Sequence, residues 1–182
     1  MAVPSPEPIT PDTKDWTWVL ERACPDCGLD PSAVARNELG TLIRDNAAGW
    51  PPVLGGPAAT ERPRPDVWSP TEYACHVRDV HVLFAERLEQ MLAEDGARFA
   101  NWDQDAAAVE QRYDLQEPAE VAAGLIAAAE RVAAVYDSVP DDGWDRRGLR
   151  SNGTEFTVES FGRYHLHDVV HHLWDVRPAG GS

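Results

Sequence analysis

Apolar residues recur every three or four positions in four separate stretches of the chain, which is the pattern of amphipathic helices. The first stretch follows Asp30 and Pro31, an N-cap and first-turn pair, and is predicted to end near Gly49. The second opens with the capping-box sequence Ser-Pro-Thr-Glu at positions 69–72 and should run to about Glu94.

The other two stretches lie in the second half of the chain. Pro118 opens the third helix, which is expected to end before Asp141. The fourth should run from Thr157 to Val176, and its apolar residues lie on most sides, which predicts a largely buried helix. Because no convincing alternating strand pattern accompanies these helices, the sequence predicts an all-α protein, a four-helix bundle.

With 182 residues, the chain is long enough for one domain with a substantial core. We expect residues 30–177 to form the bundle and residues 1–29 to form a proline-rich N-terminal extension with a Cys-x-x-Cys turn at Cys24 and Cys27. The favoured interpretation of these cysteines is two free thiols that shape a turn. A local disulfide and half of a zinc knuckle are the alternatives.

Charge and hydropathy narrow the class of partner. Asp and Glu number 31 against 16 Lys and Arg, a formal charge of −15 that repels phosphate backbones and anionic lipid. The sequence has neither a signal-peptide pattern nor an apolar run long enough to cross a bilayer. We therefore expect a cytoplasmic protein that acts on a small molecule, without nucleic acid or membrane, and a homodimer is compatible with the sequence.

Histidines crowd the fourth predicted helix. His167 and His171 are four residues apart, so both side chains can point at one metal ion. Asp168 and His172 form a competing pair with the same spacing on another face, and periodicity alone does not choose between the pairs.

A third ligand is expected from the second helix. His76 lies at the edge of the apolar stripe of that helix, and His81 is the substitute candidate. The predicted metal ligands are therefore His76, His167 and His171. Three neutral imidazoles leave a fourth position open, as a catalytic zinc-type site requires. Zinc is the first choice of divalent ion, with nickel and others as alternatives, and histidines that are simply hydrogen-bonded in the core are the competing interpretation.

Three charged residues close to these histidines are secondary candidates. Asp79 and Asp175 follow His76 and His171 by three and four residues and could orient the ligating imidazoles, although surface solvation explains them equally well. Arg163 could meet an anionic group of a substrate, although a solvated side chain or an ion pair with Glu159 is the simpler interpretation.

Two segments resemble the DinB-like superfamily, which includes thiol-dependent transferases and mycothiol-dependent maleylpyruvate isomerases. They are Trp68-Ser-Pro-Thr-Glu-Tyr-Ala-Cys-His76-Val-Arg-Asp79 and His165-Leu-His167-Asp-Val-Val-His171-His172-Leu-Trp-Asp-Val176. The resemblance implies a four-helix bundle of DinB-like type, with one histidine on the second helix and an H-x-x-x-H or E-x-x-x-H pair on the last. That pattern maps onto His76, His167 and His171.

The resemblance also implies a function. A metal-dependent S-transferase or isomerase would activate a low-molecular-weight thiol, here a mycothiol-like one, toward a small electrophilic substrate. Two alternatives stay open: a hydrolase that uses a metal-bound water, and a non-catalytic bundle that binds a metal or ligand.

Overall fold

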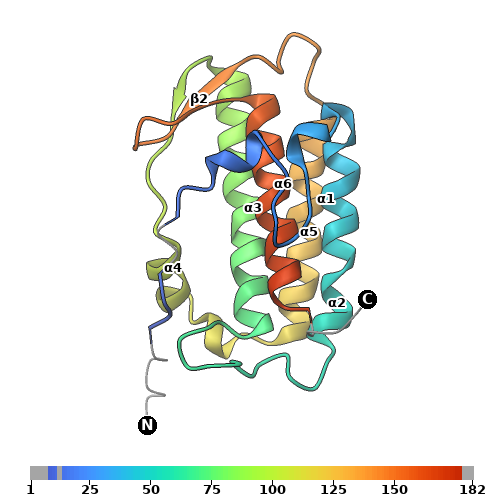
Figure 1. The fold of residues 1–182 in the computed structure, drawn as a ribbon, viewed down its shortest axis with the longest axis vertical. Coiled ribbons are helices and arrows are strands. Elements are labelled where there is room, and N and C mark those ends of the chain that lie inside the picture. The colour runs from blue at the N-terminus through green and yellow to red at the C-terminus, as the bar shows by residue number, and fades with distance from the viewer. Residues whose placement is uncertain (1–7, 12–13, 178–182) are drawn as a thin grey trace.

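Four long helices pack around one apolar core in the computed structural model, which describes residues 8–11 and 14–177 (Figure 1). They are α1 (Leu39–Ala48), α3 (Pro70–Ala93), α5 (Pro118–Asp137) and α6 (Val158–Asp175). Helices α1 and α3 each contact both α5 and α6, so the four form a closed bundle. In Figure 1, α3 and α5 run in one direction and α1 and α6 in the other. The prediction of a four-helix bundle is thus confirmed.

The core is built from the apolar stripes that the sequence pattern indicated. Its largest fully buried side chains include aromatic rings from three of the long helices and from the loops between them. They are Trp50, Tyr113, Tyr136, Phe156 and Phe161. Burial of large rings is the main source of stability in a domain of this size, because each ring removes a large apolar area from water.

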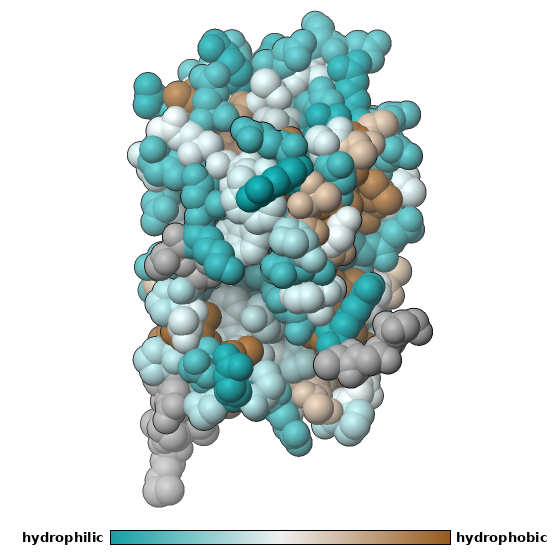
Figure 2. Space-filling view, viewed as in Figure 1, coloured by the Kyte–Doolittle hydropathy of each residue, from teal (hydrophilic) through white to brown (hydrophobic). Residues whose placement is uncertain are grey.

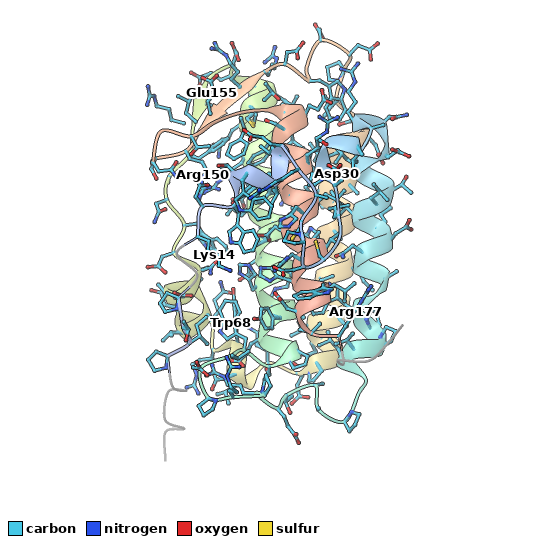
Figure 3. All side chains as sticks on the ribbon, viewed as in Figure 1. Lys14, Asp30, Trp68, Arg150, Glu155 and Arg177 are labelled. Carbon is cyan, nitrogen blue, oxygen red and sulfur yellow. The ribbon has the colours of Figure 1, made fainter. Side chains whose placement is uncertain are left out.

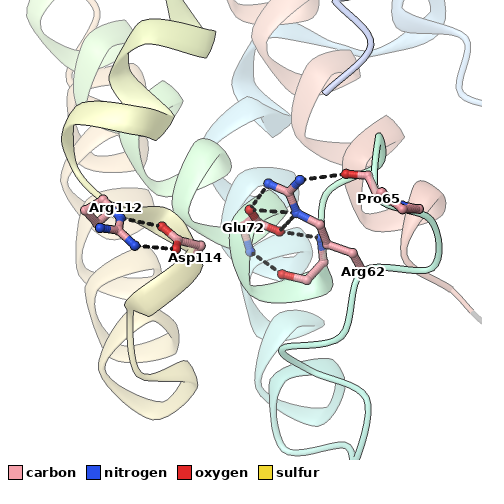
Figure 4. A network of polar contacts seen from close by, with 6 residues as sticks. Arg62, Pro65, Glu72, Arg112 and Asp114 are labelled. Carbon is pink, nitrogen blue, oxygen red and sulfur yellow. Dashed lines mark hydrogen bonds and ion pairs between the residues drawn. The ribbon is translucent and has the colours of Figure 1, made fainter. Parts of the chain in front are cut away.

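The start of α3 is fixed by its capping box. Ser69 accepts a hydrogen bond from the backbone N–H of Glu72, and the Glu72 carboxylate accepts one from the backbone N–H of Ser69 at 2.8 Å. Arg62 forms an ion pair with the same buried carboxylate and donates a hydrogen bond to the Pro65 carbonyl at 2.7 Å (Figure 4). The proline-rich loop before α3 is therefore tied to the helix, and it delivers Trp68 to the base of the site described below.

The start of the first predicted helix is wrong. Short 3-10 turns occupy Pro31–Ala33 and Arg36–Glu38, as another does Thr17–Leu20, and α1 begins only at Leu39. Asp30 does cap the first of these turns, but the backbone is extended at Val34, whose carbonyl accepts hydrogen bonds from Arg163 at 2.9 and 3.1 Å. A tertiary contact thus overrides the local helix signal. After α1, a short helix α2 spans Trp50–Leu54.

The prediction that the chain lacks strands is also wrong. A small sheet has the order β1 (Ala97–Arg98), β2 (Arg147–Leu149) and β3 (Glu155–Thr157), with β1 parallel to β2 and β2 antiparallel to β3. Strands of two or three residues are too short to show an alternating pattern. Gly148 allows close packing here, because a Cβ atom at this position would overlap the Phe99 ring.

The long connection between α3 and α5 contains further short elements. The helix α4 (Gln104–Glu110) and a 3-10 turn at Tyr113–Leu115 lie in a stretch for which the sequence analysis predicted no helix. The Asp103 side chain caps α4 by accepting from two backbone N–H groups. This connection brings Trp102 and Gln104 beside α3, where they line the cavities of the site.

The visible face of the molecule is mostly polar, and it is hollowed near its centre (Figure 2). None of the helices in the described residues is long and apolar enough to cross a membrane.

Candidate metal centre

A histidine from α3 meets a carboxylate and a histidine from α6 inside the bundle. His76, Asp168 and His172 each offer one ligand atom, and these three atoms lie within 4.8 Å of one another. Asp168 and His172 are one helical turn apart on α6, so they share a face of the helix. We call these three residues the bundle cluster.

His76 is deeply buried within this cluster. Its side chain is 2 % exposed and packs between the indole rings of Trp68 and Trp102, with ring centroids 5.3 and 5.6 Å away. Burial holds the pKa of His76 well below its usual value, and the neighbouring His172 lowers this pKa further. The imidazole is therefore neutral, as a metal ligand must be, and its buried Nδ1 has no hydrogen-bond partner.

His172 is held in one orientation by an acidic residue of its own helix. Its Nδ1 lies 3.0 Å from Oδ2 of Asp175, which as a carboxylate can only accept. The proton is thus on Nδ1, and the lone pair of Nε2 is on the side of Asp168, 3.9 Å from its Oδ1. A carboxylate behind a ligating imidazole is a common feature of metal sites, because it fixes the tautomer and raises ligand basicity.

Two adjoining cavities open onto the bundle cluster. The outer cavity, of about 370 Å³, is lined by Asp168 and His172 together with Lys14, Trp16 and polar residues of α4 and α6. The inner cavity, of about 120 Å³, is lined by His76 and Asp168 and by apolar rings. Asp168 borders both cavities, so a molecule in either one can reach the cluster. Figure 3 shows Lys14, Trp68 and Arg150 along the same side of the bundle.

Two arginines give the inner cavity positive charge in a protein that is otherwise strongly acidic. Arg87 on α3 is largely buried and donates a hydrogen bond to the Ala100 carbonyl. Burial lowers the pKa of Arg87 to about 10, and the nearby Arg150 adds to this effect. Arg150 lies in the turn between β2 and β3 and lines both cavities. An anion bound between these guanidinium groups would relieve their repulsion.

Of the three predicted ligands, the structure places His76 apart from the other two. His167 and His171 lie with Cys24 and Cys27, and the four ligand atoms are within 4.8 Å of one another. The ring centroids of His167 and His171 are 5.3 Å apart. The histidine that approaches His76 is instead His172, at a centroid distance of 4.8 Å. The partner of His76 on α6 is thus the Asp168 and His172 pair that periodicity could not separate from its rival.

The secondary candidates also have definite places. Asp175 is a neighbour of the histidines, as predicted, but its shorter contact is with His172 rather than with His171. Asp79 accepts a hydrogen bond from the Tyr113 hydroxyl at 2.5 Å and pairs with Arg78. Arg163 pairs with Glu159 at 2.8 Å and lines neither cavity, in agreement with its simpler interpretation.

His81, the substitute candidate for the third ligand, lies elsewhere in the core. Its Nδ1 is 3.1 Å from Nε2 of His165, whose Nδ1 faces the Tyr136 hydroxyl at 3.3 Å. This buried row of hydrogen-bonding groups matches the expectation for core histidines that bind no metal.

The donor set of the bundle cluster fits a divalent metal ion. Two imidazoles and one carboxylate are a known catalytic zinc set, and they leave a coordination position open for a substrate. The buried His76 nitrogen without a hydrogen-bond partner is the kind of atom that such an ion would engage. The nickel and iron alternatives use the same donor types.

Comparisons with known proteins agree with this fold. The structure resembles YfiT from Bacillus subtilis, described as a probable metal-dependent hydrolase with an unusual four-helix bundle topology, at a TM-score of 0.69 and 16% identity, covering 79% of this chain and 88% of YfiT. It also resembles the mycothiol-dependent maleylpyruvate isomerase at a TM-score of 0.63 and 12% identity, covering 82% of this chain, and a mutant of that enzyme at 0.65 and 11%, covering 80%.

The chain spans 62 to 63% of the length of these isomerase structures. No curated protein matches the sequence. The family model described as the DinB superfamily matches residues 34–176, which is most of the chain and includes every residue of the bundle cluster. The chain belongs to the DinB superfamily.

Proposed function

We propose that this protein is a metal-dependent enzyme whose ion is held by His76, Asp168 and His172. The observation that carries the proposal is the convergence of these three donors at a place that two cavities reach. A divalent ion bound there would supply Lewis acidity to a thiol or a water that enters the cavity. An open cavity beside the donors favours chemistry over a purely structural role, for which all positions of the ion are closed.

The two cavities differ in size and lining, and this difference suggests two substrates. The outer cavity is larger and mostly polar, so it suits a polar low-molecular-weight thiol such as mycothiol. The inner cavity is small and combines apolar rings with Arg87 and Arg150, so it suits a small anionic electrophile. The solved isomerase that shares this fold is described as mycothiol-dependent, which supports the same assignment.

Residues of the chain would position this electrophile. Arg150 and Arg87 would pair with its carboxylate, and Tyr164 borders both cavities beside them. Burial raises the pKa of the Tyr164 hydroxyl, so the group stays protonated and can donate a hydrogen bond to a substrate oxygen. We therefore propose transfer of the thiol to the electrophile, or its thiol-assisted isomerisation.

Hydrolysis without a thiol is the second candidate. It is supported by YfiT, described as a probable metal-dependent hydrolase, which this chain matches over 88% of the YfiT length. In that case the outer cavity would admit water and the leaving group, and the cluster residues would keep the same roles.

The test measures turnover of a small unsaturated dicarboxylate by protein that has been stripped of metal and reloaded with zinc or nickel, with and without mycothiol. We expect turnover that needs both metal and thiol and that is lost in His172→Ala and Asp168→Asn. Glu159→Gln is the matched control, since this carboxylate lies on α6 but lines neither cavity. Turnover without thiol would favour hydrolysis, and activity that survives both cluster variants would refute the proposal.

A further inference from the structure

A second group of metal-binding side chains lies behind the bundle cluster, where the N-terminal segment crosses α6. Cys24 and Cys27 come from the turn before Asp30, and His167 and His171 come from α6. Their four ligand atoms lie within 4.8 Å of one another. Nothing in the proposed reaction uses these residues. We call them the cysteine cluster.

The sequence spacing suits a closed zinc site. Cys-x-x-Cys followed by His-x-x-x-His is the ligand spacing of structural sites with two cysteines and two histidines. The two cysteines are brought together by a tight turn, in which Gly28 has a positive φ of 77° and its N–H bonds the Cys24 carbonyl at 2.9 Å. The Cys24 N–H also bonds the Leu29 carbonyl at 2.8 Å, which closes the turn.

The distances support the same conclusion. Sγ of Cys24 lies 3.7 Å from Nδ1 of His171. In a tetrahedral zinc site with ordinary Zn–S and Zn–N bond lengths, a sulfur and a nitrogen ligand are about 3.6 Å apart. The donors are therefore already spaced as ligands of one ion, although 3.7 Å also suits a weak hydrogen bond between thiol and imidazole.

Burial and the absence of other partners give an independent argument. Cys24 is 1 % exposed and His167 is 3 % exposed, and Nε2 of His167 is a buried nitrogen with no hydrogen-bond partner. Trp16 covers the site, with its ring centroid 5.5 Å from His167 and 4.9 Å from His171. A buried polar nitrogen without a partner costs stability, which a bound cation would recover.

We propose that Cys24, Cys27, His167 and His171 bind a structural zinc ion that fastens the N-terminal segment to α6. Four protein ligands of this type close the coordination sphere, in contrast to the open bundle cluster. Binding replaces the two thiol protons, which pass to solvent, and changes no oxidation state. The ion would fix Trp16 and thereby a wall of the outer cavity.

This inference does not depend on the proposed enzymatic function. The experiment replaces zinc with cobalt(II) in the full-length protein and records the near-ultraviolet absorption that arises only when cobalt is bound to thiolate. Zinc content of the unsubstituted protein is measured in parallel. We expect the thiolate band in the wild type and its loss in Cys24→Ser/Cys27→Ser, together with the loss of one zinc per chain.

Two control variants make the result specific. Cys75→Ala removes the third cysteine of the chain, which is buried in α3 outside both clusters, and it should keep the band. His172→Ala should also keep it, whether or not the bundle cluster proves to hold an ion. Single Cys27→Ser, at a half-buried position, repeats the test if the double variant folds poorly.

Three results would overturn the inference. The first is a wild-type protein without the thiolate band. The second is a band that Cys24→Ser/Cys27→Ser retains. The third is a purified chain whose mass is lower by the two thiol hydrogens of Cys24 and Cys27, because a disulfide would then occupy both sulfurs.

Discussion

Nδ1 of His172 donates a hydrogen bond to Oδ2 of Asp175 at 3.0 Å. The other carboxylate oxygen of Asp175 lies 3.7 Å from Nε2 of His171, so this acidic residue stands between the bundle cluster and the cysteine cluster. It is the nearest link between the two groups of ligands, and its stronger contact is with the histidine of the proposed catalytic site.

Removal of the Asp175 charge should weaken metal binding at the bundle cluster. Substitutions behind a ligating histidine typically reduce metal affinity by roughly 10- to 100-fold. We expect a loss of this size for Asp175→Asn, measured by competition with a chelator in a Cys24→Ser/Cys27→Ser background. Glu159→Gln should bind as tightly as its parent, and an unchanged affinity in Asp175→Asn would show that the hydrogen bond does not support the site.

Arg150 should contribute to substrate binding more than to chemistry. It reaches the cavity from the β-hairpin turn and is not a member of either metal cluster. Loss of one charge-assisted hydrogen bond costs about 1.5–3 kcal/mol, or roughly a 10- to 100-fold change in binding. Arg150→Gln should therefore raise KM for a carboxylate substrate by that factor and change kcat little. An effect on kcat alone would contradict this role.

Stability should fall as the pH drops below about 6.5, because His81 is buried in its neutral form. Burial lowers the pKa of His81 to about 3, so the folded chain binds fewer protons than the unfolded chain between these values. This contribution to stability is complete above the unfolded pKa and is lost as the pH falls toward the folded one. Between pH 7.5 and 5 the loss from this residue is about 2 kcal/mol.

The measurement is urea unfolding of the wild type and of His81→Gln across this pH range. Glutamine can keep a hydrogen bond to His165 but does not titrate, so its stability should fall less steeply. Comparison of the two slopes cancels the pH dependence of metal binding, which both proteins share. Equal slopes would mean that the buried histidine does not govern the acid sensitivity.

Removal of zinc from the cysteine cluster should loosen the N-terminal segment. Trypsin can cut after Lys14 and Arg22, which are exposed residues on either side of Trp16 and Trp18. We expect cleavage there to be several-fold faster in Cys24→Ser/Cys27→Ser than in Cys75→Ala, and faster still in the wild type after chelation. Cleavage rates that do not respond to either change would contradict the fastening role.

The sequence predicted the helices best where a local signal decides the structure. The capping box at Ser69 and Glu72 set the start of α3, and Thr157 set the start of α6. The start of α1 could not be predicted in this way, because the extended backbone at Val34 depends on Arg163, which is 129 residues distant. The short strands follow from tertiary packing as well, since their length is below any periodic pattern.

The site was harder to predict than the fold. Both i, i+4 pairs of α6 were visible in the sequence, but only the rotation of this helix against α3 decides which pair faces His76. Cys24 and Cys27 could not be joined to His167 and His171, because their proximity depends on how the extension folds back over α6. Arg87 and Arg150 carried no signal in the sequence, since an arginine on a helix or in a turn is usually a solvated residue.

The most direct test of the account is the metal content of two histidine variants in the Cys24→Ser/Cys27→Ser background, where only the bundle cluster should bind an ion. We predict that His172→Ala abolishes the remaining equivalent of metal and that His167→Ala retains it. The opposite result, with metal lost in His167→Ala and kept in His172→Ala, would contradict the assignment and would support a site of His76, His167 and His171.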